Sequence, residues 1–188
     1  MKLKLLLLAL SILEISAVAQ VHPGIKVGGN IADLHGDESG AHSKVGLHVG
    51  VLAHIHLSDE FALQPELVYS RQGVKSRVSG NDVSLHLDYL NLPVLIQYMF
   101  SNGFRIQTGP QFGFMLSAEA QSGNQSQDVK NQYNSIDLSL PVGVGYIADS
   151  GFGVDLRYVV GLSNVSENDD NKVTNGVLQL GVFYQFGR

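Results

Sequence analysis

The feature that most constrains this chain is an alternation of apolar and other residues with a period of two. It is clearest between residues 152 and 163, where the even positions are Phe152, Val154, Leu156, Tyr158, Val160 and Leu162. The odd positions of the same stretch are Gly153, Asp155, Arg157, Val159, Gly161 and Ser163. Because successive side chains of a β-strand point to opposite faces, this pattern predicts a strand with one apolar face.

Comparable alternation marks seven further stretches of the chain. They cover about residues 25–34, 44–57, 61–70, 83–100, 104–117, 136–146 and 178–186. Three very short connections, at 58–60, 101–103 and 149–151, alternate with four longer polar ones, at 35–42, 72–82, 120–134 and 164–171. The connections are rich in Gly, Ser, Asn and Asp, which favour turns and loops. The pattern predicts an all-β fold, an eight-stranded antiparallel up-and-down barrel.

One of these stretches changes phase. Odd positions hold Val83, Leu85 and Leu87, whereas the apolar residues stand at even positions from Leu90 onward. A β-bulge adds one residue to a strand and moves the side chains beyond it to the other face. We therefore predict a one-residue bulge near Asp88–Tyr89 in this strand.

Four features predict that the apolar faces contact lipid and that the other faces line the barrel interior. Glycines gather on the polar faces, where a narrow and strongly curved interior leaves little room. Aromatic residues form two levels roughly 15–20 Å apart, as they do at the two interfaces of a membrane. All short connections lie on the side of the chain ends and all long ones on the other. The last strand carries Phe186 near the carboxyl terminus. These features predict a transmembrane barrel; the alternative is an exported soluble barrel that binds an apolar ligand inside.

The amino terminus has the pattern of an export signal. Met1–Lys4 is short and basic, Leu5–Leu13 is apolar, and Ala17–Ala19 has the small residues of a cleavage site. We predict a cleaved signal peptide over residues 1–19 and a single outer-membrane β-barrel domain over residues 20–188. After the signal, no apolar run reaches the length that a transmembrane helix needs.

Composition excludes several classes of protein. The chain has no cysteine, which excludes disulfides, a cysteine-based zinc site and a lipid anchor on an amino-terminal cysteine. Its formal net charge is −5, and Lys and Arg do not cluster along the sequence. Nucleic acid is therefore not an expected partner.

Several motifs together resemble a known family. They are Gly24–Lys26, Leu63–Ser70, Tyr89–Val94, Thr108–Gly113 and Gly151–Tyr158, and in this order they are similar to the outer-membrane β-barrel ("porin family") proteins common in Bacteroidetes. The resemblance implies a location in the cell outer membrane. It also implies two partners, the outer-membrane lipid and the barrel-assembly machinery during biogenesis. It implies little about activity, because most members of this family have none assigned.

Four charged residues fall on the faces predicted to line the lumen: Glu66, Arg105, Asp155 and Arg157. An unpaired charge in such an interior costs several kcal/mol, so these side chains are expected to pair. A barrel of this size holds its own side chains and little else. We therefore predict a lumen charge network that plugs the barrel. A narrow channel for small solutes or ions is the alternative.

His54 and His56 lie on one predicted strand face and are the candidate metal ligands. A metal also needs further ligands, and no spacing in the sequence identifies them. No nucleophile motif such as G-x-S-x-G is present. We therefore predict no metal, no cofactor and no enzymatic activity. The predicted function is a structural or surface-interaction role, in which four polar extracellular loops are available to an unknown ligand.

Overall fold

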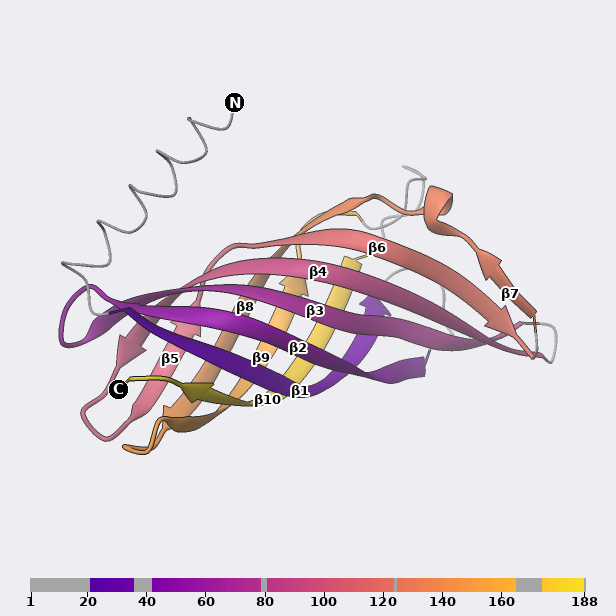
Figure 1. The fold of residues 1–188 in the computed structure, drawn as a ribbon. Helices are drawn as coiled ribbons and strands as arrows, with labels where there is room; N and C mark the ends of the chain where they lie inside the picture. The colour runs from indigo at the N-terminus through magenta and orange to yellow at the C-terminus, as the bar shows by residue number, and fades with distance from the viewer. Residues whose placement is uncertain (1–20, 36–41, 79–80, 124, 165–173, 188) are drawn as a thin grey trace, which may run out of the picture.

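The computed structural model in Figure 1 describes residues 21–35, 42–78, 81–123, 125–164 and 174–187. Over these residues the chain forms ten strands and one short 3₁₀ turn. The strands are β1 Val21–His35, β2 His42–His56, β3 Phe61–Val78, β4 Asn81–Met99, β5 Phe104–Thr108, β6 Gln111–Ser122, β7 Gln125–Asp128, β8 Ile136–Ile147, β9 Phe152–Gly161 and β10 Thr174–Gln185, and the turn is η1 Lys130–Gln132.

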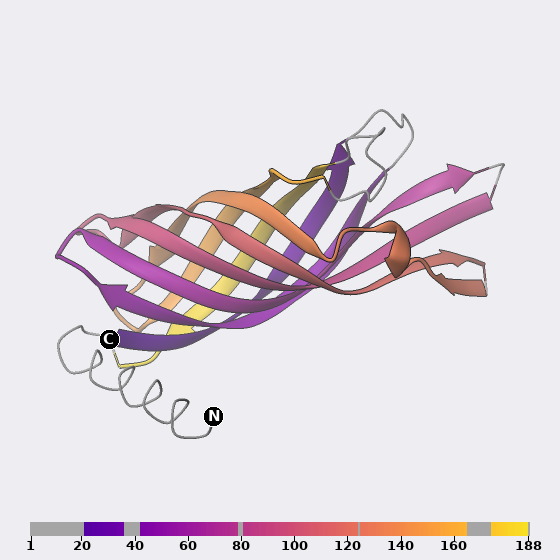
Figure 2. The same ribbon diagram turned by 90° about the horizontal axis from the view of Figure 1, so that it is seen from above.

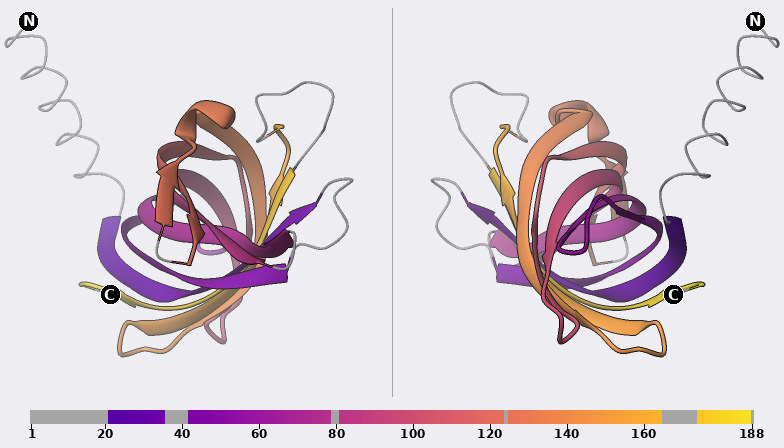
Figure 3. Two further views of the ribbon diagram at one scale, coloured as in Figure 1. Left: turned by 90° about the vertical axis from the view of Figure 1, so that its right-hand side faces the viewer. Right: turned by 90° about the vertical axis from the view of Figure 1, so that its left-hand side faces the viewer.

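The strands form a closed antiparallel barrel, seen from its two ends in Figure 3. Closure is made by β1 and β10, which pair from Gly24 opposite Gln185 to His35 opposite Thr174. β5 and β6 act as one barrel strand, because both pair with β4 and with β8. They are separated only at Gly109–Pro110, where proline has no N–H to donate to the ladder. Over the described residues the barrel therefore has eight strands, as predicted.

Three tight turns mark one end of the barrel, which we call the short-turn end. They connect β2 to β3, β4 to β5 and β8 to β9, at the predicted positions. Gly103 and Gly151 each have a φ of 86°, a conformation that glycine adopts without steric cost. The predicted signal peptide, residues 1–19, lies outside the described residues, as do most residues of the loops predicted at 35–42 and 164–171.

The loops predicted at 72–82 and 120–134 are wrong in large part, because strands continue through them. β3 and β4 stay paired as far as Val78 opposite Asn81, and β6 runs on to Ser122 and pairs with β7. Two adjacent strands satisfy each other's backbone groups, so a polar composition does not end them. Figures 1 and 2 show both hairpins projecting beyond the other strands. We call β3–β4 and β6–β7 the two ribbons, and this end the ribbon end.

The predicted bulge exists at the expected level but in a different strand. β4 pairs with β3 without a shift, whereas its pairing with β6 shifts between Asp88, opposite Ser117, and Tyr89, opposite Met115. Leu116 of β6 is therefore the extra residue. Leu87 keeps the same inward phase as Tyr89, and both are buried. The inner face of β4 thus changes from polar to apolar toward the ribbon end, and this change caused the wrong prediction.

The barrel is apolar outside and largely polar inside, as predicted. On β9, Phe152 is 65% exposed and Leu156 is 44% exposed, whereas Arg157, the residue after Leu156, is 3% exposed. This arrangement is the reverse of a soluble barrel that binds an apolar ligand, so that alternative is wrong. In the described part of the chain, no helix has the length and apolar character needed to cross a membrane.

Candidate functional site: the barrel lumen

The centre of the lumen holds a compact group of four charged side chains. They are Lys26 of β1, Glu66 of β3, and Asp155 and Arg157 of β9, each no more than 4% exposed. Each stands at an inward position of its strand, between residues whose side chains point to the outer surface. The alternation of each strand therefore aims these groups at the barrel axis.

The four groups form a closed network of ion pairs. Arg157 binds Glu66 through two parallel hydrogen bonds, Nη1 to Oε2 at 2.8 Å and Nη2 to Oε1 at 2.7 Å. Its Nη2 also lies 3.3 Å from Oδ2 of Asp155. Lys26 Nζ lies 3.3 Å from Glu66 Oε2 and 3.2 Å from Asp155 Oδ2. Two cations and two anions thus balance one another, as a dry interior requires.

Lys26 is the member of this network that sequence reasoning missed. The signal was present, because Lys26 stands between the apolar residues Ile25 and Val27. The stretch around it carries the adjacent glycines Gly28 and Gly29, which obscure the alternation. The even phase of the strand would have placed Lys26 inside.

Arg105 lies in the same lumen, nearer the short-turn end. Its Nη1 donates to Oε1 of Gln97 at 3.1 Å, and its guanidinium carbon lies 5.5 Å from the ring centroid of Phe183. Phe183 in turn forms a buried apolar cluster with Leu52 and Ile147. Two amides connect Arg105 to the four-charge network, because Gln97 Nε2 donates to Gln107 Oε1 at 2.8 Å and Arg157 Nη2 donates to the same oxygen at 3.4 Å.

The two candidate metal ligands lie at the short-turn end of β2. The rings of His54 and His56 meet edge to face with centroids 4.6 Å apart, and His22 approaches His56 at 5.5 Å. Among the residues that the structure describes, no three His, Asp or Glu side chains are grouped as metal ligands. The edge-to-face contacts are those of packed rings.

Layers of other side chains lie on both sides of the charge network. Toward the ribbon end, Asn30 Nδ2 donates to Ser70 Oγ at 2.8 Å, and Gln72 Nε2 donates to the same oxygen at 3.0 Å. Beyond them, the buried apolar residues Ala32, Val159 and Val177 pack together. Toward the short-turn end lies the Leu52, Ile147 and Phe183 cluster. The charges are therefore enclosed between amide and apolar layers.

Residues 17–167 match the family described as "Outer membrane protein beta-barrel domain". This chain belongs to that family. The sequence-based assignment to an outer-membrane β-barrel family is therefore confirmed, and the barrel is located in the cell outer membrane. Comparison with curated proteins gave no match.

Solved structures agree on the fold of this outer-membrane barrel. Neisserial surface protein A superposes with a TM-score of 0.60 at 17% identity, covering 87% of this chain and 97% of that one. Ail, the attachment invasion locus protein of Yersinia pestis, superposes with a TM-score of 0.56 at 16% identity, covering 88% of this chain and 98% of that one. The family is described as an outer membrane protein domain, one neighbour as a surface protein and the other as an attachment invasion locus protein.

Proposed function

We propose that this outer-membrane barrel is a membrane-anchored surface-interaction protein whose lumen is plugged and whose ribbons contact ligands outside the cell. The observation that carries the proposal is the enclosed network of Lys26, Glu66, Asp155 and Arg157. A solute crossing the lumen would have to break these pairs and also displace the apolar layers. Leaving one charge of such a network uncompensated costs about 3–5 kcal/mol.

The ribbons support the second half of the proposal. Their base holds a small apolar core of Leu87, Tyr89, Met115 and Ala118, against which Tyr133 packs. A packed base stiffens a projecting hairpin, because an isolated two-stranded hairpin is only marginally stable. The four residues of β7 are all exposed and polar. The ribbons therefore combine a stiff base with a polar tip that is available for contact.

The fold neighbours favour the same class of role over a channel. One is described as a surface protein and the other as an attachment invasion locus protein. With this role we propose the remaining features of the chain: a cleaved signal peptide at 1–19, insertion by the barrel-assembly machinery, extracellular ribbons, and no catalytic activity, metal or cofactor.

The first test is conductance. The purified chain is inserted into planar lipid bilayers and compared with Glu66→Gln, which removes the anion shared by Lys26 and Arg157. We expect no stable open current from the unmodified chain. A steady current carried by the unmodified chain would contradict the plug and favour the channel alternative.

The second test addresses the ribbons. Residues 75–84 are replaced by Asn-Gly, which closes a two-residue hairpin between Val74 and Leu85, two residues that already pair. Bacteria that display either form are compared for attachment to cultured cells and to matrix-coated plates. We expect the shortened form to insert normally and to lose attachment. Equal attachment of both forms would contradict a role for this ribbon.

A further inference from the structure

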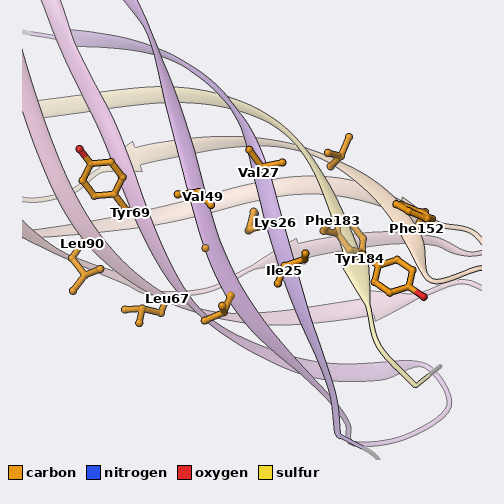
Figure 4. Close-up of a pocket in the computed structure, with 13 residues that line it drawn as sticks. Ile25, Lys26, Val27, Val49, Leu67, Tyr69, Leu90, Phe152, Phe183 and Tyr184 are labelled. Atoms are coloured by element: carbon orange, nitrogen blue, oxygen red, sulfur yellow. The ribbon is translucent and has the colours of Figure 1, made fainter.

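The outer wall of the barrel carries a groove of about 610 Å³ that the lumen network and the ribbons do not explain. It runs across the outer faces of β9, β10, β1, β2, β3 and β4 (Figure 4). We call it the wall groove. Its lining includes one charged residue, Lys26, whose ammonium group binds Glu66 and Asp155 inside the barrel. The surface presented by the groove is therefore apolar.

The floor of the wall groove consists of short side chains in two cross-strand rows. In one row Val182 pairs with Val27 and Val27 pairs with Val49. In the other row Ile25 pairs with Val51. Residues paired across neighbouring strands stand side by side on one face, so these β-branched side chains form a continuous shallow strip.

Bulkier side chains close the two ends of the strip. Figure 4 shows Phe152 and Tyr184 at one end, and Leu67, Tyr69 and Leu90 at the other. The same rows connect them, because Tyr184 pairs with Phe152 on β9 and Tyr69 pairs with Leu90 on β4. The rings of Phe152 and Tyr184 at one end and of Tyr69 at the other thus bound a floor whose outward side chains carry no ring.

The dimensions of the wall groove match a hydrocarbon chain in one leaflet. Five strand-to-strand spacings of about 4.8 Å separate β9 from β4, which gives a length of about 24 Å. With strands tilted by about 45°, this path rises about 17 Å along the membrane normal. One leaflet of the hydrocarbon core is about 15 Å thick.

We propose that the wall groove binds one acyl chain of a membrane lipid, lying diagonally across β10, β1 and β2. The groove is continuous with the lipid-facing surface of the barrel, so hydrocarbon is the medium that reaches it. A narrow, flexible chain fills a recessed strip, whereas the convex wall of a second copy would leave voids there, and unfilled space forfeits dispersion contacts. The bound acyl chain therefore contacts the protein on several sides, unlike the neighbouring lipid chains.

The test fills the groove and leaves the rest of the wall unchanged. Val49→Phe places a ring on the floor, and Val27→Phe is a second variant at a neighbouring position. The matched control is Val142→Phe on β8, because Val142 faces lipid outside the groove and is 50% exposed, close to the 53% of Val49. A slower-migrating band after boiling verifies that each variant folds in detergent.

Each protein is mixed with palmitoyl-oleoyl phosphatidylglycerol and examined by native mass spectrometry under increasing activation. We expect the unmodified chain and Val142→Phe to retain one lipid after all others have dissociated, and Val49→Phe and Val27→Phe to lose it with the rest. Equal lipid retention by the filled variants and the control would overturn the proposal. A dimer that lacks retained lipid and disappears in Val49→Phe would overturn it too, because a second copy would then occupy the groove.

Discussion

Glu66 is the residue through which the lumen charges are connected. Its carboxylate accepts hydrogen bonds from Arg157, from Lys26 and from Gln64, the last at 2.7 Å. A buried carboxylate with this many donors stabilises both cations at once. Removing its charge leaves Asp155 as the anion that balances two cations within the network.

We therefore expect Glu66→Gln to lower the free energy of unfolding by about 3–5 kcal/mol. The measurement is urea unfolding in detergent or lipid, followed by the loss of the fast-migrating folded band. Glu119→Gln on β6 is the matched control, because Glu119 is exposed, and it should change stability little. If the two variants unfold at the same urea concentration, the network does not stabilise the barrel.

Residues that face lipid limit which substitutions the barrel tolerates. Val154 is 49% exposed on the lipid face of β9, and its substitution by arginine puts a charge into hydrocarbon. We expect Val154→Arg to reduce stability by about 2–4 kcal/mol, as such changes do near the bilayer midplane. The same urea titration checks this. Gln125→Arg, on the exposed strand β7, is the control and should be neutral.

At the scale of elements, the bulge in β6 joins two parts of different character. On the membrane side of the bulge, Met115 and Gly113 face the interior, and on the side of the ribbon, Ala118 faces the interior. Leu116 is the extra residue that makes this change of phase, and the pairing of Asp88 with Ser117 resumes beyond it. Ser117 Oγ donates to Asp88 Oδ2 at 3.1 Å. The bulge thus lets one strand serve both the membrane wall and the ribbon base.

Deletion of Leu116 is therefore expected to be tolerated. Without it, Met115 and Ala118 still face inward, since the alternation becomes regular. Leu92 in β4 pairs with Phe112 in a part of the ladder that has no register shift. Deletion of Leu92 should abolish folding, because it turns every side chain of β4 after that position to the wrong face. Heat-dependent gel migration distinguishes the outcomes. Failure of both variants would mean that the bulge itself is required.

At the scale of the whole molecule, stability depends on closure of the sheet. β1 and β10 come from opposite ends of the chain, and their pairing leaves no open edge in the barrel wall. An open edge would expose unpaired backbone groups to hydrocarbon, at several kcal/mol for each group. The barrel is therefore expected to fold as one unit.

We expect Leu180→Pro on β10 to prevent folding of the entire barrel. Leu180 pairs with Gly29 on one side and with Leu156 on the other, so loss of its N–H and the proline ring disrupt the wall by about 3 kcal/mol or more. Gln127→Pro on β7 should leave the barrel intact, because β7 pairs with β6 alone among the described strands. Circular dichroism in detergent, combined with gel migration, measures both. An intact barrel in Leu180→Pro would refute single-unit folding.

Local sequence determined the strands, their facing and the short turns. Alternation is a direct consequence of the geometry of an extended chain, so residue parity alone puts Phe152 and Arg157 on opposite faces. The glycines on the polar faces and the asymmetry of the connections then indicated that Phe152 faces outward. Gly103 and Gly151 mark tight turns because a positive φ suits glycine. Neither inference needs knowledge of a partner strand.

Tertiary structure alone decided which lumen charges meet. Arg157 is 91 residues from Glu66, and Lys26 is 129 residues from Asp155. Their heights in the barrel depend on the stagger of all the strands between them, which single-strand alternation does not contain. For the same reason, Arg105 lies at another level, and the extra residue lies in β6 instead of β4. The apparent phase change of β4 came from apolar residues on its inner face, Leu87 and Tyr89, and the extra residue of β6 is revealed only by the pairing of the two strands.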